Sequence, residues 1–293
     1  MKLIKVEILN LPIGQVSYRR LGRGARKILF FHGFPGSSAQ IQIFEKFIQS
    51  HDLEVLSFDR PGYNQTVLKN DSGSLDGLAE TLSLAREFSK FFDWQKFEIF
   101  SVSGGTPFAL SFAQKFPNMV QNLHVMCGLG AIRELSIDVH YRKHILWGLK
   151  ILPLTPGWIL KMAMLSSNRK NLRAHNPLLN YFLPSSQIDS DFMSQLEVRT
   201  TLKTSLTEAM AQNAIGPKLD AQVFLSDWGS ELKNFPHHIH FWHGEEDFVL
   251  PFQMSERMSE IIPEATFRKI SGEGHISLPG RALKMILDQA TKS

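Results

Sequence analysis

The chain of 293 residues has little cysteine: Cys127 is the only one, so no internal disulfide bond can form. This excludes the small secreted domains that disulfides hold together, and it suits a protein of the reducing cytoplasm, where we expect this one. A chain of this length buries about three quarters of its unfolded surface and needs no such staple. Charges at Lys2, Lys5 and Glu7 interrupt the apolar residues of the first segment, so we expect no signal peptide.

Long uninterrupted hydrophobic runs are also missing. The most membrane-like stretch, HILWGLKILPLTPGWILKMAML at 144–165, is broken by Lys150, Pro153, Pro156 and Lys161. A helix that crosses a bilayer would have to accommodate these residues in hydrocarbon. We therefore interpret the stretch as buried or pocket-lining helices and expect no membrane partner.

Strong charge of one sign is absent, since the formal net charge is only +4. The basic clusters RRLGRGARK (19–27) and NRKNLRAH (168–175) lack regularly interleaved aromatic residues, which indicates solvated surface and no nucleic-acid partner. No glycine-rich phosphate loop is present, so no cofactor is implied.

The histidine-rich run HHIHFWH at 237–243 is the one segment that resembles a metal site. On a strand only alternate residues share a face, so His238 and His240 can pair while His237 points away. Two histidines are too few to bind a metal ion unless residues from elsewhere in the chain contribute further ligands. We therefore expect a buried strand end and no bound metal.

Three regions follow one another along the chain. Apolar β-type runs alternate with helical patterns up to about residue 128 and again from about 238, which predicts a parallel sheet with crossover helices. The predicted strands are 5–9, 14–21, 27–32, 54–58, 97–102, 122–127, 238–243 and 265–271, the first two forming a hairpin. The predicted helices are 38–50, 74–92, 106–116, 251–262 and 278–290.

Few strand signals and much helical pattern occur between about 130 and 231, together with three of the five tryptophans. We interpret this segment as an inserted helical cap. The chain then divides into a core domain of residues 1–129 and 232–293 and a cap of residues 130–231.

The short stretch FSVSGGTPFAL at 100–110 places Ser103 between a strand and a helix. Such a junction fits a sharp turn that exposes the serine, provided that the residues two before and two after it are small, as Ser101 and Gly105 are. Pro107 suits the first turn of the helix because its missing N–H would have no intrahelical partner there. Taken alone, Ser103 is as well explained as a helix cap.

Four further motifs change that balance, and with them the chain resembles the α/β-hydrolase family. They are FFHGFPG (30–36), DRPGY (59–63), HGEEDFVLP (243–251) and GEGHISL (272–278), in the order of the family. The serine turn matches the family's G-x-S-x-G except that Ser101 replaces the first glycine. The resemblance implies an α/β fold with a mostly parallel eight-stranded sheet, helices on both faces, and the cap inserted after the sixth strand.

The resemblance also implies roles for particular positions. Family order gives Ser103 as nucleophile, Asp247 as acid and His275 as base. Glu245 and Glu246 compete for the acid role, but Asp247 has the family's spacing. The oxyanion hole would consist of the backbone N–H groups of Phe34 and Gly104.

Aromatic and thioether side chains of the cap are candidates for the substrate pocket, although apolar residues at helical spacing are more often plain core. The candidates are Trp147, Trp158, Met162 and Phe182. A serine nucleophile favours acyl transfer to water from a small to medium apolar ester or a related acyl compound, a small-molecule substrate. A non-hydrolytic binding protein, an acyltransferase and a carbon–carbon bond hydrolase stay open, as do the substrate and the oligomeric state.

Overall fold

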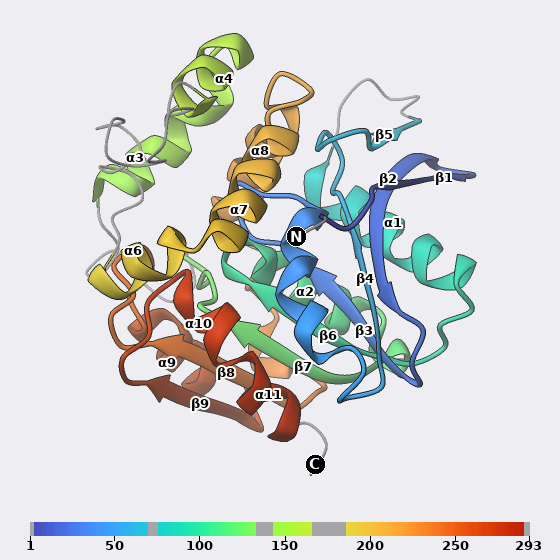
Figure 1. Cartoon of the computed structure of the whole chain (residues 1–293), viewed down its shortest axis with the longest axis vertical. Coiled ribbons are helices and arrows are strands. Elements are labelled where there is room, and N and C mark those ends of the chain that lie inside the picture. Colours follow the sequence, from blue (N-terminus) through green and yellow to red (C-terminus); the bar gives the residue numbers. More distant parts are fainter. Residues whose placement is uncertain (1–2, 70–75, 133–142, 166–185, 290–293) are drawn as a thin grey trace.

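A mostly parallel sheet forms the centre of the computed structural model, which describes residues 3–69, 76–132, 143–165 and 186–289 (Figure 1). Within these residues the sheet has nine strands, and eight of them follow the order β1-β2-β4-β3-β6-β7-β8-β9 while β5 pairs only with β2. The strands are β1 (Glu7–Leu11), β2 (Gly14–Gly22), β3 (Arg26–Phe31), β4 (Leu53–Phe58), β5 (Val67–Leu68), β6 (Phe97–Val102), β7 (Val120–Met126), β8 (Ile239–Gly244) and β9 (Ala265–Ile270).

The predicted parallel sheet and its opening hairpin are confirmed. β1 and β2 pair antiparallel, with Glu7 opposite Tyr18, whereas the neighbours from β4 to β9 along the sheet are all parallel. All six residues of β4 are buried. Burial on both sides is typical of parallel strands that helices cover on both faces.

The side chains of each strand point alternately to the two faces of the sheet, so the core has two layers. On one face, the apolar residues of α1 (Gly77–Phe91), α2 (Thr106–Lys115) and α9 (Gln253–Ile261) pack with Leu29 and Phe31. On the other face, those of the 3₁₀ helix η1 (Ser38–Phe47) and of α11 (Leu283–Gln289) pack with Ile28 and Phe30. Because successive residues of a strand point to opposite faces, one strand serves both layers.

Two predicted helices differ in detail. The segment 38–50 forms the 3₁₀ helix η1, and the segment predicted as one helix at 278–290 forms α10 (Ser277–Arg281) and α11, with Ala282 between them. The break is a single residue: the backbone of Ala282 stays in the right-handed helical region, and its N–H still donates to the Leu278 carbonyl at 2.9 Å.

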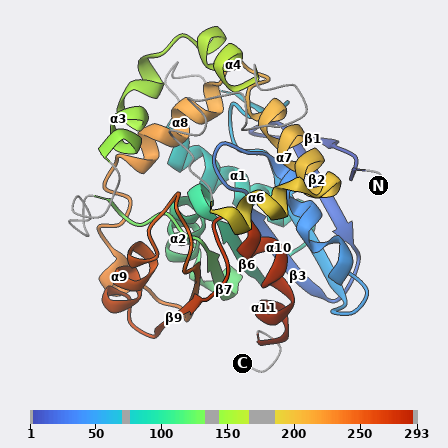
Figure 2. The same cartoon turned by 60° about the vertical axis from the view of Figure 1, so that its left-hand side comes forward.

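Five α-helices are described between β7 and β8, and we call them the helical region. They are α3 (Lys143–Ile151), α4 (Gly157–Leu165), α6 (Gln187–Ser194), α7 (Leu196–Ala209) and α8 (Ile215–Phe224). α7 packs against η1, α8 against α1, and α6 against α10, and Figures 1 and 2 show α6 beside α10 from both directions. None of the described helices is long and apolar enough to cross a membrane.

Candidate active site

Ser103 lies at the junction of β6 with the short 3₁₀ turn η2 (Ser103–Gly105) that leads into α2. Its φ is +52°, a conformation that residues other than glycine rarely adopt and that marks a sharp, strained turn. A Cβ on Gly105 would lie 2.5 Å from the carbonyl oxygen of Phe31, so a larger residue cannot fit two positions after the serine. The structure therefore contains the predicted strand-to-helix turn.

The hydroxyl of Ser103 does not cap α2, which has no side-chain cap at its N-terminus. It faces His275 instead: the distance from Ser103 Oγ to His275 Nε2 is 3.0 Å. On the other side of the ring, His275 Nδ1 lies 2.7 Å from Asp247 Oδ2. The structure thus brings together three residues that are far apart in the sequence, and all three side chains are buried.

Asp247 has four hydrogen-bond partners. Its Oδ1 accepts from the backbone N–H groups of Val249 and Leu250 at 2.9 and 2.8 Å, and its Oδ2 accepts from His275 and, at 3.0 Å, from His243 Nε2. Burial by itself raises the pKa of Asp247, but the charge of His275 and the hydrogen bonds from both histidines outweigh it and hold the pKa below its ordinary value. The carboxylate is therefore ionised at neutral pH.

His243 is the residue of this group that the sequence analysis did not single out. It is fully buried on β8, and its Nδ1 lies 2.7 Å from Ser255 Oγ. Its Nε2 lies 3.0 Å from both the Leu250 carbonyl oxygen and Asp247 Oδ2. Because both of these oxygens can only accept, His243 carries its proton on Nε2 and can accept the Ser255 hydroxyl proton at Nδ1. Its position in the motif HGEED, directly before the glycine, was the signal available in the sequence.

The residues predicted to form an oxyanion hole are neighbours in space. A Cβ on Gly104 would lie 2.5 Å from Phe34 Cβ, so the two backbones approach closely. The loop before Phe34 is held in place by Gln40, whose Oε1 accepts from Gly33 N at 2.7 Å, and by Arg60, whose Nη1 donates to the His32 carbonyl at 2.8 Å. Phe34 lines the cavity together with Ser103, the residue before Gly104.

The two competing acids do not join this group. Glu245 is exposed and forms an ion pair of 3.0 Å with Lys269, and Glu246 is half-buried. Asp247 alone among these three acids contacts His275 in the interactions that the structure shows.

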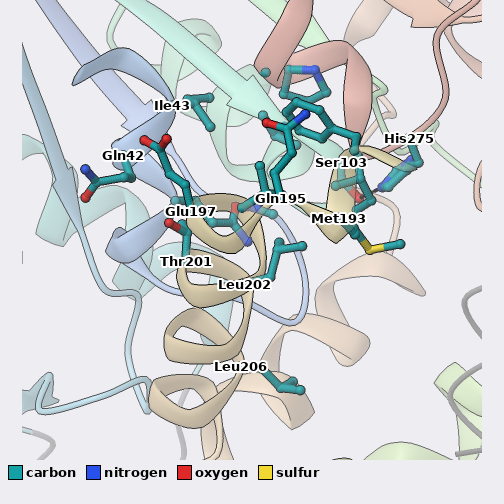
Figure 3. Close-up of a pocket in the computed structure, with 18 of the residues that line it drawn as sticks. Gln42, Ile43, Ser103, Met193, Gln195, Glu197, Thr201, Leu202, Leu206 and His275 are labelled. Atoms are coloured by element: carbon teal, nitrogen blue, oxygen red, sulfur yellow. Dashed lines mark hydrogen bonds between the residues drawn. The ribbon is translucent and has the colours of Figure 1, made fainter. Parts of the chain in front are cut away.

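A cavity of about 240 Å³ opens beside Ser103 and His275 (Figure 3). Its apolar lining comes from the loop at 34, from η1, and from the helices α6 and α7 of the helical region. These side chains include Phe34, Ile43, Phe47, Phe192, Met193, Val198, Leu202 and Leu206; Val102 of β6, Val249 and Ile276 also line the cavity. Figure 3 shows Ser103 and His275 toward one end of the view, with Gln42 and Glu197 toward the other.

The pocket candidates of the sequence analysis occupy other places. Trp147 on α3 and Trp158 and Met162 on α4 are 61%, 61% and 65% exposed, and none of them lines this cavity. Phe182 lies outside the described residues. Helical spacing identified apolar side chains but not the direction that each helix faces, and the lining comes from α6 and α7 instead.

One group of possible metal ligands exists among the described residues: Cys127, His243 and Asp247, whose ligand atoms lie within 4.8 Å of one another. Burial and the negative charge of Asp247 raise the pKa of the Cys127 thiol well above its ordinary value. Metals bind the thiolate, and both nitrogens of His243 already have hydrogen-bond partners. The chemistry of this donor set fits a hydrogen-bond network better than a metal site.

Comparison with known proteins places this geometry in a family. The model of the alpha/beta hydrolase fold family matches residues 27–281. Among curated proteins, 2-hydroxy-6-oxo-2,4-heptadienoate hydrolase of Pseudomonas putida is 23% identical over 173 residues. That match covers 59% of this chain and 54% of the relative, so the chain aligns with about half the length of that protein.

Solved structures match over nearly the whole chain. A thermophilic esterase from Thermogutta terrifontis has a TM-score of 0.66 at 14% identity, covering 98% of this chain and 97% of that one. The enol-lactonase from Burkholderia xenovorans LB400 has a TM-score of 0.64 at 11% identity, covering 98% of each chain. At such low identities these two structures support the fold alone.

Proposed function

The chain belongs to the alpha/beta hydrolase fold family, and from that premise we propose that it is a serine hydrolase that cleaves carboxylic esters or related acyl bonds through an acyl-enzyme on Ser103. The observation that most strongly supports the proposal is the pair of hydrogen bonds that links Ser103 Oγ through His275 to Asp247, at 3.0 and 2.7 Å. A serine hydroxyl is a weak nucleophile unless a base takes its proton, and this arrangement supplies the base and the acid that orients it.

In the proposed mechanism, Ser103 Oγ attacks the acyl carbon while its proton moves to His275 Nε2. Asp247 holds the proton on Nδ1 and stabilises the imidazolium that forms. The negative carbonyl oxygen accepts hydrogen bonds from the N–H groups of Phe34 and Gly104, each worth about 3 kcal/mol in the transition state. When the intermediate collapses, the carbon–oxygen bond to the alcohol breaks and the alcohol takes the proton from His275.

The second half of the cycle regenerates the enzyme. A water molecule gives its proton to His275 and attacks the acyl-enzyme, and the intermediate releases the carboxylic acid as the proton returns to Ser103 Oγ. Both halves use the same three side chains, so the proposal needs no cofactor.

The cavity indicates the size and polarity of the substrate. Its volume of about 240 Å³ lies just below the range of roughly 300–1,000 Å³ that is typical of drug-sized ligands. Lys46 at its rim is exposed and lies 3.8 Å from Glu197, so the two charges offset each other. A small, uncharged ester with an apolar acyl or alcohol part fits this site.

A fluorophosphonate probe and a panel of p-nitrophenyl esters of graded chain length test the proposal. We expect the probe to label Ser103 and S103A to lose at least about 10⁴-fold in kcat. S101A is the matched control, because Ser101 is a buried serine two residues away in the same turn. Equal turnover by S103A and S101A would contradict the role of Ser103.

Carbon–carbon bond hydrolysis is the second candidate, because the curated relative is named as a hydrolase of a dienoate. A dienoate added to the same panel discriminates between the two candidates. If the protein hydrolyses the dienoate but none of the esters, the second candidate is favoured. An added alcohol that diverts product to a new ester would identify an acyltransferase. Retention of a ligand without turnover would identify a binding protein.

The cytoplasmic location and the cap boundaries at 130 and 231 remain predictions.

A further inference from the structure

A carboxylate of the helical region holds the backbone on both sides of the His275 side chain. Asp189, in the first turn of α6, is fully buried. Its Oδ2 accepts from the N–H of His275 at 3.0 Å, and its Oδ1 accepts from Ile276 N at 2.8 Å and Ser277 N at 2.9 Å. Three consecutive backbone donors therefore end on one side chain that is 86 residues away from the first of them.

These donors need a partner from elsewhere in the chain. Ile276 and Ser277 are the N-cap and the first residue of α10, where the N–H groups of a helix have no carbonyl within the helix to bond with, and His275 directly precedes them. An ionised carboxylate forms stronger hydrogen bonds to such groups than a neutral acceptor does, and the helix dipole favours it there. Asp189 thus supplies the acceptors for three backbone donors of the turn that carries His275.

The fit around this carboxylate is close. A Cβ on Gly274 would lie 2.6 Å from Asp189 Cγ and from both of its oxygens. Asp189 is itself held, because its backbone N–H donates to Ser186 Oγ at 3.1 Å. A side chain at position 274 would therefore displace the Asp189 carboxylate.

The same helix forms a wall of the substrate cavity. Phe192 and Met193 of α6 line it, and so does Ile276 next to the histidine. Phe192 also leaves no room for a side chain at Gly280, and the Arg281 guanidinium lies 5.4 Å from the centre of its ring. A displacement of α6 would therefore be transmitted to the turn at 275 through both Asp189 and Phe192.

We propose that Asp189 is a positioning residue that holds His275 within reach of both Ser103 and Asp247 and fixes the α6 wall of the cavity against it. This inference rests on the proposed function, because it assigns to Asp189 the placement of the proposed base. Asp189 touches no reacting atom and acts only through the backbone of residues 275–277.

The test compares D189N with E98Q. Asparagine has nearly the shape of aspartate, but its NH₂ group must face one of the three N–H groups, and no hydrogen bond forms between two donors. Glu98 is the matched control: it is buried at the far end of β6, where it accepts from Arg26 at 2.6 and 2.9 Å. We expect kcat and the rate of fluorophosphonate labelling to fall about 10- to 100-fold in D189N but not in E98Q, with KM within about threefold, because misplacing a catalytic group by 1 Å can cost about 100-fold.

A second measurement needs no substrate. The Nδ1 proton of His275, hydrogen-bonded to Asp247, should give a proton NMR signal that H275A lacks. In D189N this proton should exchange with water at least about tenfold faster than in E98Q at equal thermal stability. G274A retains the charge of Asp189 but crowds its carboxylate, so it should show the same losses and serves if D189N does not fold.

The outcomes separate the two proposals. Exchange and kcat in D189N or G274A within threefold of E98Q would overturn the role of Asp189. If the wild-type chain neither labels at Ser103 nor hydrolyses any ester, the proposed function fails, and the exchange rate alone then decides whether Asp189 holds His275.

Discussion

Replacing His243 with phenylalanine should destabilise the protein by about 3–5 kcal/mol, and the structure shows where this cost arises. The His243 ring is fully buried, and its Nε2 lies 3.0 Å from both an oxygen of the ionised Asp247 and the Leu250 carbonyl oxygen. A hydrogen bond to a charged group is typically worth about 1.5–3 kcal/mol. The other ring nitrogen lies 2.7 Å from Ser255 Oγ. Phenylalanine would leave that buried hydroxyl without this partner, at about 1–3 kcal/mol.

The matched control is the same substitution on the neighbouring strand. His124 on β7 is also buried, but neither of its ring nitrogens has a hydrogen-bond partner in the described part of the chain. Burial keeps the pKa of His124 well below its ordinary value, so the ring is neutral. H124F removes a polar ring that makes no hydrogen bond, and we expect the free energy of unfolding to stay within about 1 kcal/mol or to rise.

Urea unfolding at pH 7 measures both variants, and kcat for the best ester of the panel measures the site. H243F should also lower kcat, because Asp247 loses one of the two donors to the oxygen that orients His275. If the free energy of unfolding of H243F lies within about 1 kcal/mol of that of H124F, the assigned hydrogen bonds do not carry the stability inferred from them.

The pH dependence provides a further check on the same residue. The folded-state pKa of Asp247 is held below its ordinary value, so its contribution to stability is fully present above the unfolded pKa of about 3.9 and is lost as the pH falls through the folded pKa. Because the His243 hydrogen bond is one cause of that lowering, H243F should raise the folded pKa. The loss of stability in acid should then be smaller in H243F than in H124F, and it should be complete at a higher pH.

Three further predictions follow from single contacts. G105A should lower the melting temperature by several degrees and slow the labelling of Ser103, because its Cβ would lie 2.5 Å from the Phe31 carbonyl oxygen; an unchanged melting temperature would argue against the tight turn. Cys127 should not react with a thiol reagent at pH 8 until the protein unfolds, because burial and Asp247 raise its pKa, and rapid reaction of the native protein would contradict this. D220A should cost about 3–5 kcal/mol in urea unfolding, because it leaves the buried Arg60 without its carboxylate partner at 2.5 Å, and a cost below 1 kcal/mol would refute that reasoning.

The strands and the serine turn could be predicted because their signals are local. The apolar runs of the strands, the small residues around Ser103 and the motif HGEED each lie within a few consecutive positions. The order of the motifs then indicated which distant residues meet, and the hydrogen bonds of His275 join the same pair of partners. The pattern was less specific at 38–50. It correctly predicted a helix there, but the helix is a 3₁₀ helix and not an α-helix.

The lining of the cavity could not be predicted in the same way. Trp147, Trp158 and Met162 have the composition of pocket residues, yet the structure exposes them on α3 and α4. Phe192 and Met193 line the cavity, although α6 reads as a short polar helix, QIDSDFMS. Which side of a helix faces a cavity depends on how the helix packs on the rest of the fold, and the helical period leaves that rotation open.

The sequence also does not show which acidic residues of the helical region are buried against the core. Asp189, Glu208 and Asp220 look like solvated charges of amphipathic helices, yet each binds a different part of the core. Their partners are the backbone at 275–277 for Asp189, Arg19 and Ser37 for Glu208, and Arg60 and Tyr63 for Asp220.

Two of these connections end at the loop that carries Phe34, and the third ends at His275. Ser37 follows the loop within three residues, and the Arg60 guanidinium that binds Asp220 also donates to the His32 carbonyl before it. A buried charge that loses its partner costs several kcal/mol, so each connection resists displacement of the loop it holds. The helical region therefore does more than cover the cavity: its three carboxylates hold in place the two backbone segments on which the proposed chemistry of Ser103 depends.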